Sequence, residues 1–394
     1  MGTRLDLKSI KPLYILATVL SLVPLYNFGN KNVKNGKYLY AFLVISIFSF
    51  MPVLSLQERL FSTYPFTPNY TDILLDFGSY VCLTLANLIN LIVLRLVHWK
   101  KLNTLIRKIQ ILDSKYFKQQ DDISNKRFNV ECSLYYGILI FGLSYNEIFW
   151  DLAYGFKSNW AYFFQNIQKL QLLTTSMLVH NIALTFKYRF ECLNRNLSQT
   201  RINLYVKKDL LYPIANDMSK SVKVINEIHK SLLIMFRDFN TIFGVPVIFI
   251  MMVFVFGMLH PINSVLLQLI KGNIISGMDD PDFGKHYVAI TSLIAISTFT
   301  FVIPFSFSCH GAVAEAKKVS LISRTVINDL PIYLYDESLK LLIDELKIIA
   351  EESPNKYPLF SARGFYPIDN TVLLILFGTV TTYLIVLIQL NMED

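Results

Sequence analysis

The chain has 394 residues, of which 53% are hydrophobic and only 17% are charged. Its mean hydropathy is +0.41, and its charged fraction lies well below the roughly 25% of an average soluble protein. These values exclude an ordinary soluble fold. The net charge of +8 would suggest nucleic-acid binding in a soluble protein. Here basic loops that orient membrane helices account for it, and no nucleic-acid partner is expected.

Apolar segments recur along the whole chain, in continuous runs of helix length rather than barrel-strand length. The first, residues 12–28, contains Pro12 and Pro24 and has basic residues on both sides, which favours a helix in the cytoplasmic interface. The others predict seven membrane-spanning helices in an all-α polytopic protein. They lie near residues 38–56, 73–97, 132–152, 162–186, 241–262, 287–308 and 370–391.

The loop charges orient these spans. Segments 98–131 and 187–240 are rich in Lys and Arg, whereas 57–72 contains only Arg59 and 153–161 only Lys157. Because basic loops remain in the cytoplasm, the N-terminus is predicted to be cytoplasmic and the C-terminus extracellular. Asn69, in the sequon Asn69-Tyr70-Thr71, then falls in the first outer loop and is a candidate glycosylation site.

The same topology divides the chain into six regions. Two of them, on the cytoplasmic side, carry apolar residues at helical spacing and predict long helices that pack on each other. These helices either form an intramolecular bundle or provide a platform for subunit contacts. The regions are a cytoplasmic N-terminal segment (1–37), the first four spans with an outer ligand pocket (38–186), cytoplasmic helices (187–240), spans five and six (241–308), further cytoplasmic helices (309–368) and the last span (369–394).

No catalytic, metal or cofactor site is predicted. Cys82, Cys132, Cys192 and Cys309 show no CxxC pairing and lie in or beside apolar runs, so they are interpreted as small buried hydrophobic residues. No phosphate loop, zinc motif or nucleophile elbow is present. The first apolar run also lacks a small-residue cleavage site, which predicts membrane entry through an internal span. The protein is therefore not expected to be an enzyme.

The last span resembles the C-terminal signature of insect gustatory receptors. It reads Thr382-Tyr383, five aliphatic residues, Gln389 and a hydrophobic residue. The preceding Gly364-Phe365-x-x-Ile368-Asp369 is also similar to that family. Leu390 stands where the family often has Phe and resembles the odorant co-receptor, a relative. Weaker resemblances occur at Lys11-Pro12-Leu13-Tyr14 and at Arg189-Phe190-Glu191-Cys192-Leu193-Asn194.

The resemblance implies a ligand-gated cation channel in the plasma membrane of chemosensory neurons. Four subunits, identical or shared with other gustatory receptors, would surround one pore lined by the last spans, with membrane lipid around them. The other spans would form a pocket for a small-molecule tastant, and the cytoplasmic helices would anchor the tetramer.

Candidate pore residues follow from helical spacing in the last span. Val386, Gln389, Leu390 and Glu393 lie at i, i+3, i+4 and i+7 and share one face. Rings of Val386 and Leu390 could close a pore by dewetting, a ring of Gln389 could coordinate permeating cations, and Glu393 could concentrate them. Alternatively, these aliphatic residues face lipid or neighbouring helices.

Candidate ligand-binding residues are polar or aromatic side chains within the outer halves of the spans, where polar groups are costly. Carboxylates, amides and an aromatic wall suit a hydroxyl-rich ligand such as a sugar; bitter compounds are the alternative. Some of these residues could instead be interface anchors or pair between helices, as Glu147 with Lys169. His180, deeper in the span, is expected to bond a neighbouring helix. The candidates are Asp76, Tyr80, Asn146, Glu147, Trp150, Gln165, Gln168 and His260.

Two other membrane-protein classes remain as alternatives. A G-protein-coupled receptor would need an extracellular N-terminus, opposite to the orientation that the loop charges predict. A secondary transporter often has internal repeats and broken helices. Pro246 and Pro304 could break helices, but the chain shows no matching halves.

Overall fold

The computed structural model describes residues 7–23, 38–63, 70–117, 122–154, 156–206, 211–271, 281–330, 337–351 and 360–393. The α-helices are α1 Leu7–Val19, α2 Tyr38–Glu58, α3 Tyr70–Asn90, α4 Trp99–Tyr116, α5 Asp122–Tyr154, α6 Phe156–Val206, α7 Leu211–Lys271, α8 Pro281–Thr298, α9 Ile303–Asp329, α10 Glu337–Glu351 and α11 Asn370–Glu393. Wider or tighter turns extend three of these: η1 Arg59–Thr63, η3 Leu91–Val97 and η5 Phe299–Phe301.

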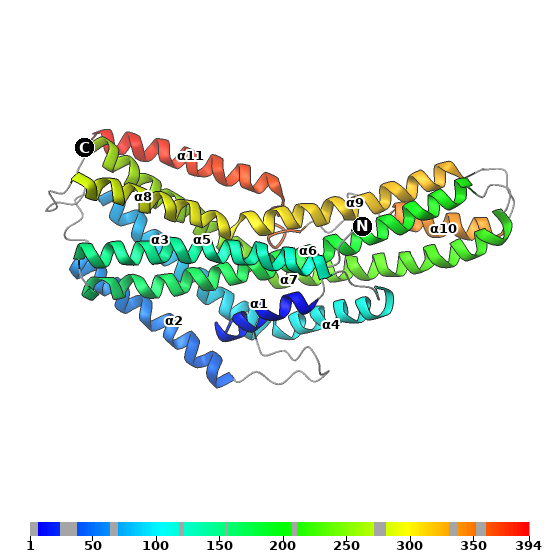
Figure 1. Ribbon diagram of the computed structural model, residues 1–394, viewed down its shortest axis with the longest axis horizontal. Coiled ribbons are helices and arrows are strands. Elements are labelled where there is room, and N and C mark those ends of the chain that lie inside the picture. Colours follow the sequence, from blue (N-terminus) through cyan, green and yellow to red (C-terminus); the bar gives the residue numbers. More distant parts are fainter. Residues whose placement is uncertain are drawn as a thin grey trace.

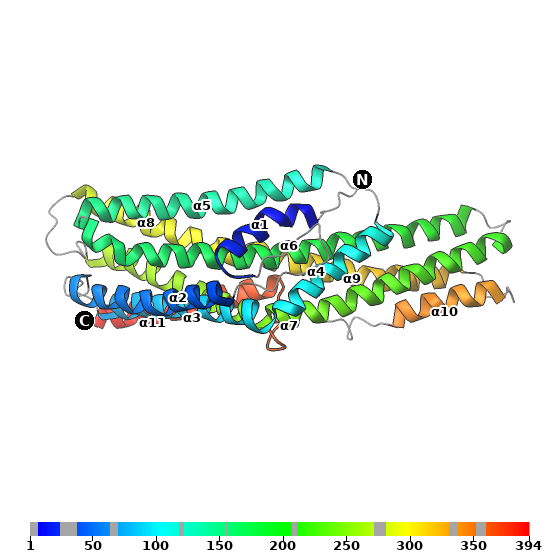
Figure 2. The ribbon, with the colours of Figure 1, turned by 90° about the horizontal axis from the view of Figure 1, so that it is seen from below.

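The helices form one elongated bundle whose two halves differ in width (Figure 1). At one end α2, α3, α5, α8 and α11 surround α6 and α7, and at the other α6, α7, α9 and α10 are the described helices that continue (Figures 1 and 2). α6 has 51 residues, so it is about 75 Å long, whereas the hydrocarbon layer of a bilayer is about 30 Å thick. The narrow half therefore extends well beyond the membrane.

The seven predicted spans correspond to helices of the wide half. Five stretches are long and apolar enough to cross a membrane: Tyr40–Phe61, Tyr70–Val97, Asp217–Leu269, Gly284–Asp329 and Asn370–Gln389. The same criteria do not select α5 and α6, which carry more polar residues. Both nevertheless run beside the selected helices in the wide half (Figure 2). The prediction of an all-α polytopic membrane protein is confirmed.

The predicted cytoplasmic helices pack on one another within a single chain. Val222 and Leu232 of α7 are fully buried, as are Leu342 and Leu346 of α10. Polar pairs at the edges of this packing fix its register. Asn226 donates to Glu345 over 2.7 Å, Arg201 pairs with Asp329 at 2.7 Å, and Asn194 donates to Glu315 over 2.9 Å. The expectation of an intramolecular bundle is confirmed, and a role in subunit contacts stays a prediction.

Two amphipathic helices lie against the junction between the halves. α1 ends earlier than the predicted segment 12–28, and residues 24–28 lie outside the described residues. It buries Leu13, Tyr14 and Ala17 and exposes Ile15 and Val19, the pattern expected of an interfacial helix. α4 was not predicted; it buries Leu105, Ile106 and Ile109, and Lys108 pairs with Asp238 of α7 at 2.7 Å.

The span formed by α8 and α9 is broken at η5, and α9 begins at Ile303 with Pro304 in its first turn. A break frees backbone carbonyls that must find partners inside the membrane. Two side chains of α6 supply them. Ser176 donates to the Phe301 carbonyl over 2.6 Å, and Nδ1 of His180 lies 2.8 Å from the Pro304 carbonyl. The expected bond from His180 to another helix is confirmed.

Candidate functional site

Arg59 is the centre of a polar cluster in the outer half of the membrane region. Its side chain is fully buried. Nη1 lies 3.0 Å from Oδ2 of Asp76, and Nη2 donates to Oε1 of Gln165 over 2.8 Å. The guanidinium carbon lies 4.3 Å from the ring centroid of Tyr80 and 4.1 Å from that of Tyr162. A buried charge is tolerated only when it is paired and hydrogen-bonded, and Arg59 meets both conditions.

Local geometry explains how these groups meet. α2 ends at Glu58, and the wide turn η1 carries Arg59 back toward the bundle. Asp76 and Tyr80 are four residues apart on α3, so they lie on the same helix face. Gln165 comes from the first turns of α6. Three segments distant in sequence are thus held together by one guanidinium.

A second polar group surrounds Asp72, one turn above Asp76 on α3. Asp72 is 6% exposed. It accepts a 2.6 Å hydrogen bond from Ser264, and Nε2 of His260 lies 3.7 Å from Oδ1. Among the described residues no Lys or Arg pairs with Asp72. The Asp72 carboxylate is thus held by a hydroxyl group and lies near an imidazole, and an opposite charge placed beside it would favour its charged form.

Aromatic rings border the Asp72 group. Trp150 and Tyr287 meet edge to face with ring centroids 6.2 Å apart, and Phe149 lies 5.3 Å from Trp150. Tyr287 also interacts with the Ser264 side chain, which donates to Asp72. A carboxylate beside aromatic faces can bind a cationic group through both charge and π electrons.

The structure brings together some of the predicted ligand residues and separates others. Asp76, Tyr80 and Gln165 all contact Arg59, and His260 lies beside Asp72.

The remaining predicted ligand residues lie in separate contacts. Asn146 accepts from Nε1 of Trp150 over 3.1 Å, Glu147 accepts from Asn166, and Gln168 donates to Thr84 over 3.2 Å, deeper in the bundle. Gln165 and Gln168 therefore belong to different networks despite their three-residue spacing.

Sequence reasoning missed Arg59, Asp72, Tyr162 and Ser264. The hydropathy pattern ends the preceding span before Arg59 and so places this residue in an outer loop. One signal was available: Asp72 and Asp76 are spaced i, i+4 at the start of an apolar span, where paired carboxylates require partners.

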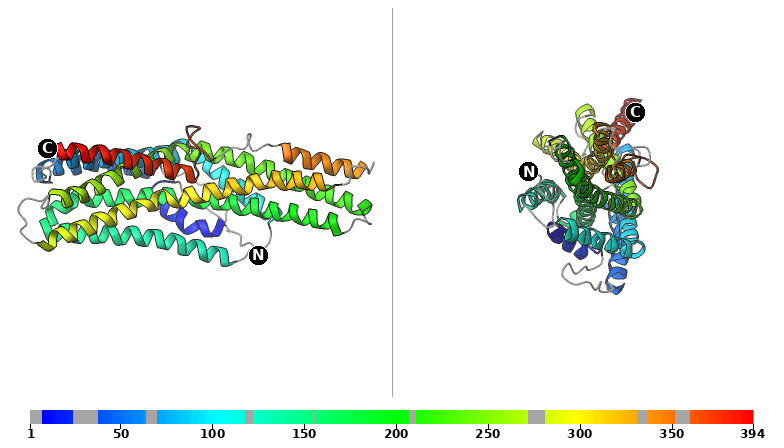
Figure 3. Two further views of the ribbon diagram at one scale, coloured as in Figure 1. Left: turned by 90° about the horizontal axis from the view of Figure 1, so that it is seen from above. Right: turned by 90° about the vertical axis from the view of Figure 1, so that its right-hand side faces the viewer.

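The last helix, α11, packs on the bundle through one face only. Val372, Leu376 and Val380 are buried at four-residue spacing, and Phe377 contacts Phe254 and Phe299 with centroids 6.2 and 5.5 Å apart. Figure 3 shows α11 at the edge of the wide half, with the C-terminus at its outer end.

The opposite face of α11 is exposed in the single chain. Of the predicted pore residues, Val386 is 45% exposed and Gln389 is exposed; the side chains of Leu390 and Glu393 lie outside those described. Thr371, Thr382 and Gln389 place polar groups on this face. The Thr382 hydroxyl donates to the Gly378 carbonyl of its own helix over 2.9 Å and Thr371 donates to Asp369. The exposed Gln389 amide is the group for which lipid is a poor neighbour, so water or another subunit is its better partner.

A linker of residues 360–369 leads into α11. Phe360 is fully buried and stacks on Phe236 at 4.2 Å. Gly364 has a φ of +86°, which favours glycine, and Asp369 caps α11 by accepting from the Thr371 N–H over 2.9 Å. The Gly-Phe-x-x-Ile-Asp pattern thus builds a turn, a buried contact at Ile368 and a helix cap.

Comparisons with known proteins give one family and one fold. A sequence model described as 7tm chemosensory receptor matches residues 10–394. Among solved structures, the insect olfactory receptor OR5 from Machilis hrabei superimposes with a TM-score of 0.61, at 13% identity and over 98% of each chain. At this identity the match shows a shared fold only. No curated protein sequence matches.

Proposed function

Because the chain belongs to the 7tm chemosensory receptor family, we propose that it is a ligand-gated cation channel opened by a small tastant. The family match confirms the resemblance read from the last span. The proposed channel is a tetramer in the plasma membrane of chemosensory neurons, formed by this chain alone or with related receptors. The observation that carries the proposal is the exposed polar face of α11 in a helix otherwise apolar enough to cross a membrane.

In the proposed channel the exposed faces of four α11 helices surround the pore. Val386 would form a hydrophobic constriction, Gln389 would offer amide oxygens to cations, and Leu390 and Glu393 would continue the lining toward the outside. Each side chain is repeated by symmetry, so one substitution changes a whole ring. Asn69, which lies outside the described residues, keeps its proposed role as a glycosylation site.

The proposed ligand site is the outer polar cluster of Asp76, Tyr80, Gln165 and their neighbours. A sugar is the first candidate ligand, because its hydroxyl groups could exchange hydrogen bonds with the carboxylates and amides there. An amine, as in many bitter compounds, is the second candidate. It is favoured by Asp72, which is buried beside Trp150 and Tyr287 and lacks a Lys or Arg partner among the described residues.

The experiment is whole-cell recording from cells that express this chain alone, during application of sugars and bitter amines. The account predicts inward cation current with one ligand class. Gln389→Arg should abolish that current without reducing surface expression, because a ring of positive charge repels cations, whereas Gln389→Asn should conserve it.

A C-terminal tag should bind antibody on intact cells. A tag accessible only after permeabilisation, or a response that requires a G protein and carries no current, would contradict the proposal.

A further inference from the structure

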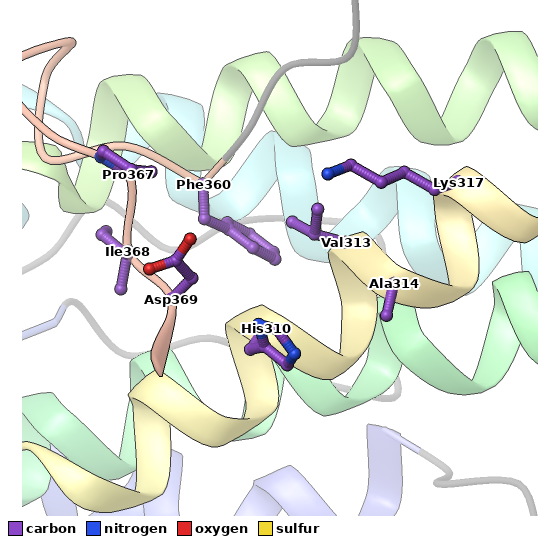
Figure 4. A pocket seen from close by; sticks show the side chains of 8 residues that line it. All are labelled: His310, Val313, Ala314, Lys317, Phe360, Pro367, Ile368 and Asp369. Atoms are coloured by element: carbon purple, nitrogen blue, oxygen red, sulfur yellow. The ribbon is translucent and has the colours of Figure 1, made fainter. Parts of the chain in front are cut away.

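A cavity of about 140 Å³ lies between α9 and the linker that leads into α11. Figure 4 shows its walls: His310, Val313 and Lys317 come from α9, and Phe360, Ile368 and Asp369 come from the linker. Phe360 and Val313 form an apolar floor in the middle. Lys317 and Asp369 stand on opposite sides of that floor, so the cavity has a cationic side and an anionic side.

The polar side chains of this cavity can form further hydrogen bonds or ion pairs. Within the described part of the chain, the Lys317 ammonium and the His310 imidazole have no hydrogen-bond or ion-pair partner. The next residue, Lys318, behaves differently and pairs with Glu315 at 2.5 Å. Asp369 accepts from Thr371 through Oδ1, which leaves its Oδ2 available.

The cavity also lies at a defined depth. The candidate span Asn370–Gln389 begins directly after Asp369, and the loop charges place this end of α11 on the cytoplasmic side. α9 passes the same level as it leaves the membrane toward the narrow half of the bundle (Figure 1). The walls are therefore at the level of the lipid headgroups of the cytoplasmic leaflet, where basic pockets between helices bind phosphate groups.

We propose that this cavity binds the headgroup of a phospholipid of the phosphatidylethanolamine type. The phosphate would lie against Lys317 and His310, and the primary ammonium would donate to Oδ2 of Asp369. Drug-sized ligands need about 300–1,000 Å³, so this cavity has room for a headgroup and not for acyl chains, which would remain in the bilayer. The bound lipid would join α9 to the first residue of α11. This inference does not depend on which tastant the protein binds, or on channel activity.

The test is native mass spectrometry of the purified full-length protein, titrated with defined phospholipids. Phosphatidylethanolamine should bind more tightly than phosphatidylcholine, whose quaternary ammonium cannot donate a hydrogen bond to Asp369. Lys317→Ala should weaken phosphatidylethanolamine binding about tenfold, the loss expected for one charge-assisted bond. Ala314→Phe, which fills the cavity without a change of charge, should weaken it as well.

Two controls separate this site from general attraction to lipid. Lys318→Ala removes the same charge one residue away and should leave binding unchanged. Asp369→Asn conserves the acceptor for the Thr371 N–H but removes the anionic side, so it should shift preference from phosphatidylethanolamine toward phosphatidylglycerol.

Three results would overturn the proposal. The first is equal weakening by Lys317→Ala and Lys318→Ala. The second is lipid binding that is unchanged both in the Ala314→Phe variant and in the Lys317→Ala variant. The third is displacement of the lipid by inorganic phosphate at similar concentration, which would make a soluble phosphate compound the ligand. Size-exclusion profiles identical to wild type would show that the variants are folded.

Discussion

α6 and α11 are both membrane helices of the same bundle, but they bury their surfaces in different ways. Every residue from 171 to 186 of α6 is buried. In α11 only 17% of the residues in the spanning window are buried, and Leu374 and Ile375 are 74% and 61% exposed. This stretch of α6 therefore finds all its neighbours within one chain, whereas α11 has them on one face only.

This difference shows that α6 stabilises the fold of the single chain, whereas α11 leaves one face for partners outside the chain. Side chains of α6 bond to α3, η1 and the broken span α8–α9, so they hold the wide half together. The exposed face of α11 carries Thr382 and Gln389 beside aliphatic residues. Aliphatic residues could face lipid, and so could Thr382, whose hydroxyl donates to the Gly378 carbonyl, but the Gln389 amide favours water or a second subunit. Substitutions should therefore lower stability in α6 and alter assembly or conduction in α11.

The largest stability effect is expected at Phe186 of α6. Its ring is fully buried and lies 4.8 Å from Phe236 and 6.2 Å from Phe360. Phe186→Ala should reduce the free energy of unfolding by about 3–5 kcal/mol, measured as a lower melting temperature of the purified protein. Phe365→Ala is the control, because Phe365 is 79% exposed. Equal shifts for the two variants would contradict the assigned burial.

A comparable loss is expected when Arg59 loses its charge. Arg59→Leu removes the guanidinium that pairs with the largely buried Asp76 carboxylate, which should cost about 3–5 kcal/mol. Asp76→Asn in the same chain should restore part of this loss, because it removes the charge that Arg59 balances. Thermal unfolding of the single and double variants measures the coupling between the two residues. Additive losses would show that the pair does not act as a unit.

An intermediate loss of stability is expected at a glycine in the packed helix α7, but not at a glycine in α11. A Cβ at Gly244 of α7 would lie 2.7 Å from the Arg363 nitrogen of the linker, whereas a Cβ at Gly378 of α11 meets no atom within 4 Å. Gly244→Ala should destabilise the protein by about 1–3 kcal/mol, and Gly378→Ala should not. Melting temperatures measure both. A stable Gly244→Ala protein with unchanged ligand responses would mean that the linker does not contact α7 this closely.

The smallest stability effect is expected on the open face of α11. Ile385 is 53% exposed, so Ile385→Ser should change the stability of a single chain by less than about 0.5 kcal/mol. If another subunit covers this face, the same substitution should still reduce the tetramer fraction in native gel electrophoresis or mass photometry. Unchanged assembly would indicate that lipid or water, rather than protein, covers Ile385.

The elements that could be predicted from the sequence are those whose pattern of apolar residues lies within one continuous segment. Long apolar runs marked the spans, and helical spacing in 187–240 and 309–352 marked the cytoplasmic helices, because both patterns are read along one helix. The amphipathic α4 carries the same signal in Leu105, Ile106 and Ile109, but the many Lys and Arg residues of this segment also fit a basic loop.

The candidate site was less predictable, because it depends on contacts between distant segments. Nothing near Arg59 in the sequence shows that η1 turns inward to Asp76 and Gln165. Gln165 and Gln168 looked equivalent by spacing, yet one bonds to Arg59 and the other to Thr84. Which face of α11 is open could be predicted only by analogy, since it depends on where α7 and α9 pack.

Cysteine accessibility along α11 during recorded current tests the central claim most directly. Cysteine would be introduced singly at Thr382 and Gln389 on the open face, and at Leu376 and Val380 on the face that packs on the bundle. A charged thiol reagent applied from outside should block the ligand-evoked current only in the first pair, and wild type is the control for Cys82, Cys132, Cys192 and Cys309. Block at Leu376 or Val380, with none at Thr382 and Gln389, would contradict a pore lined by the open face of α11.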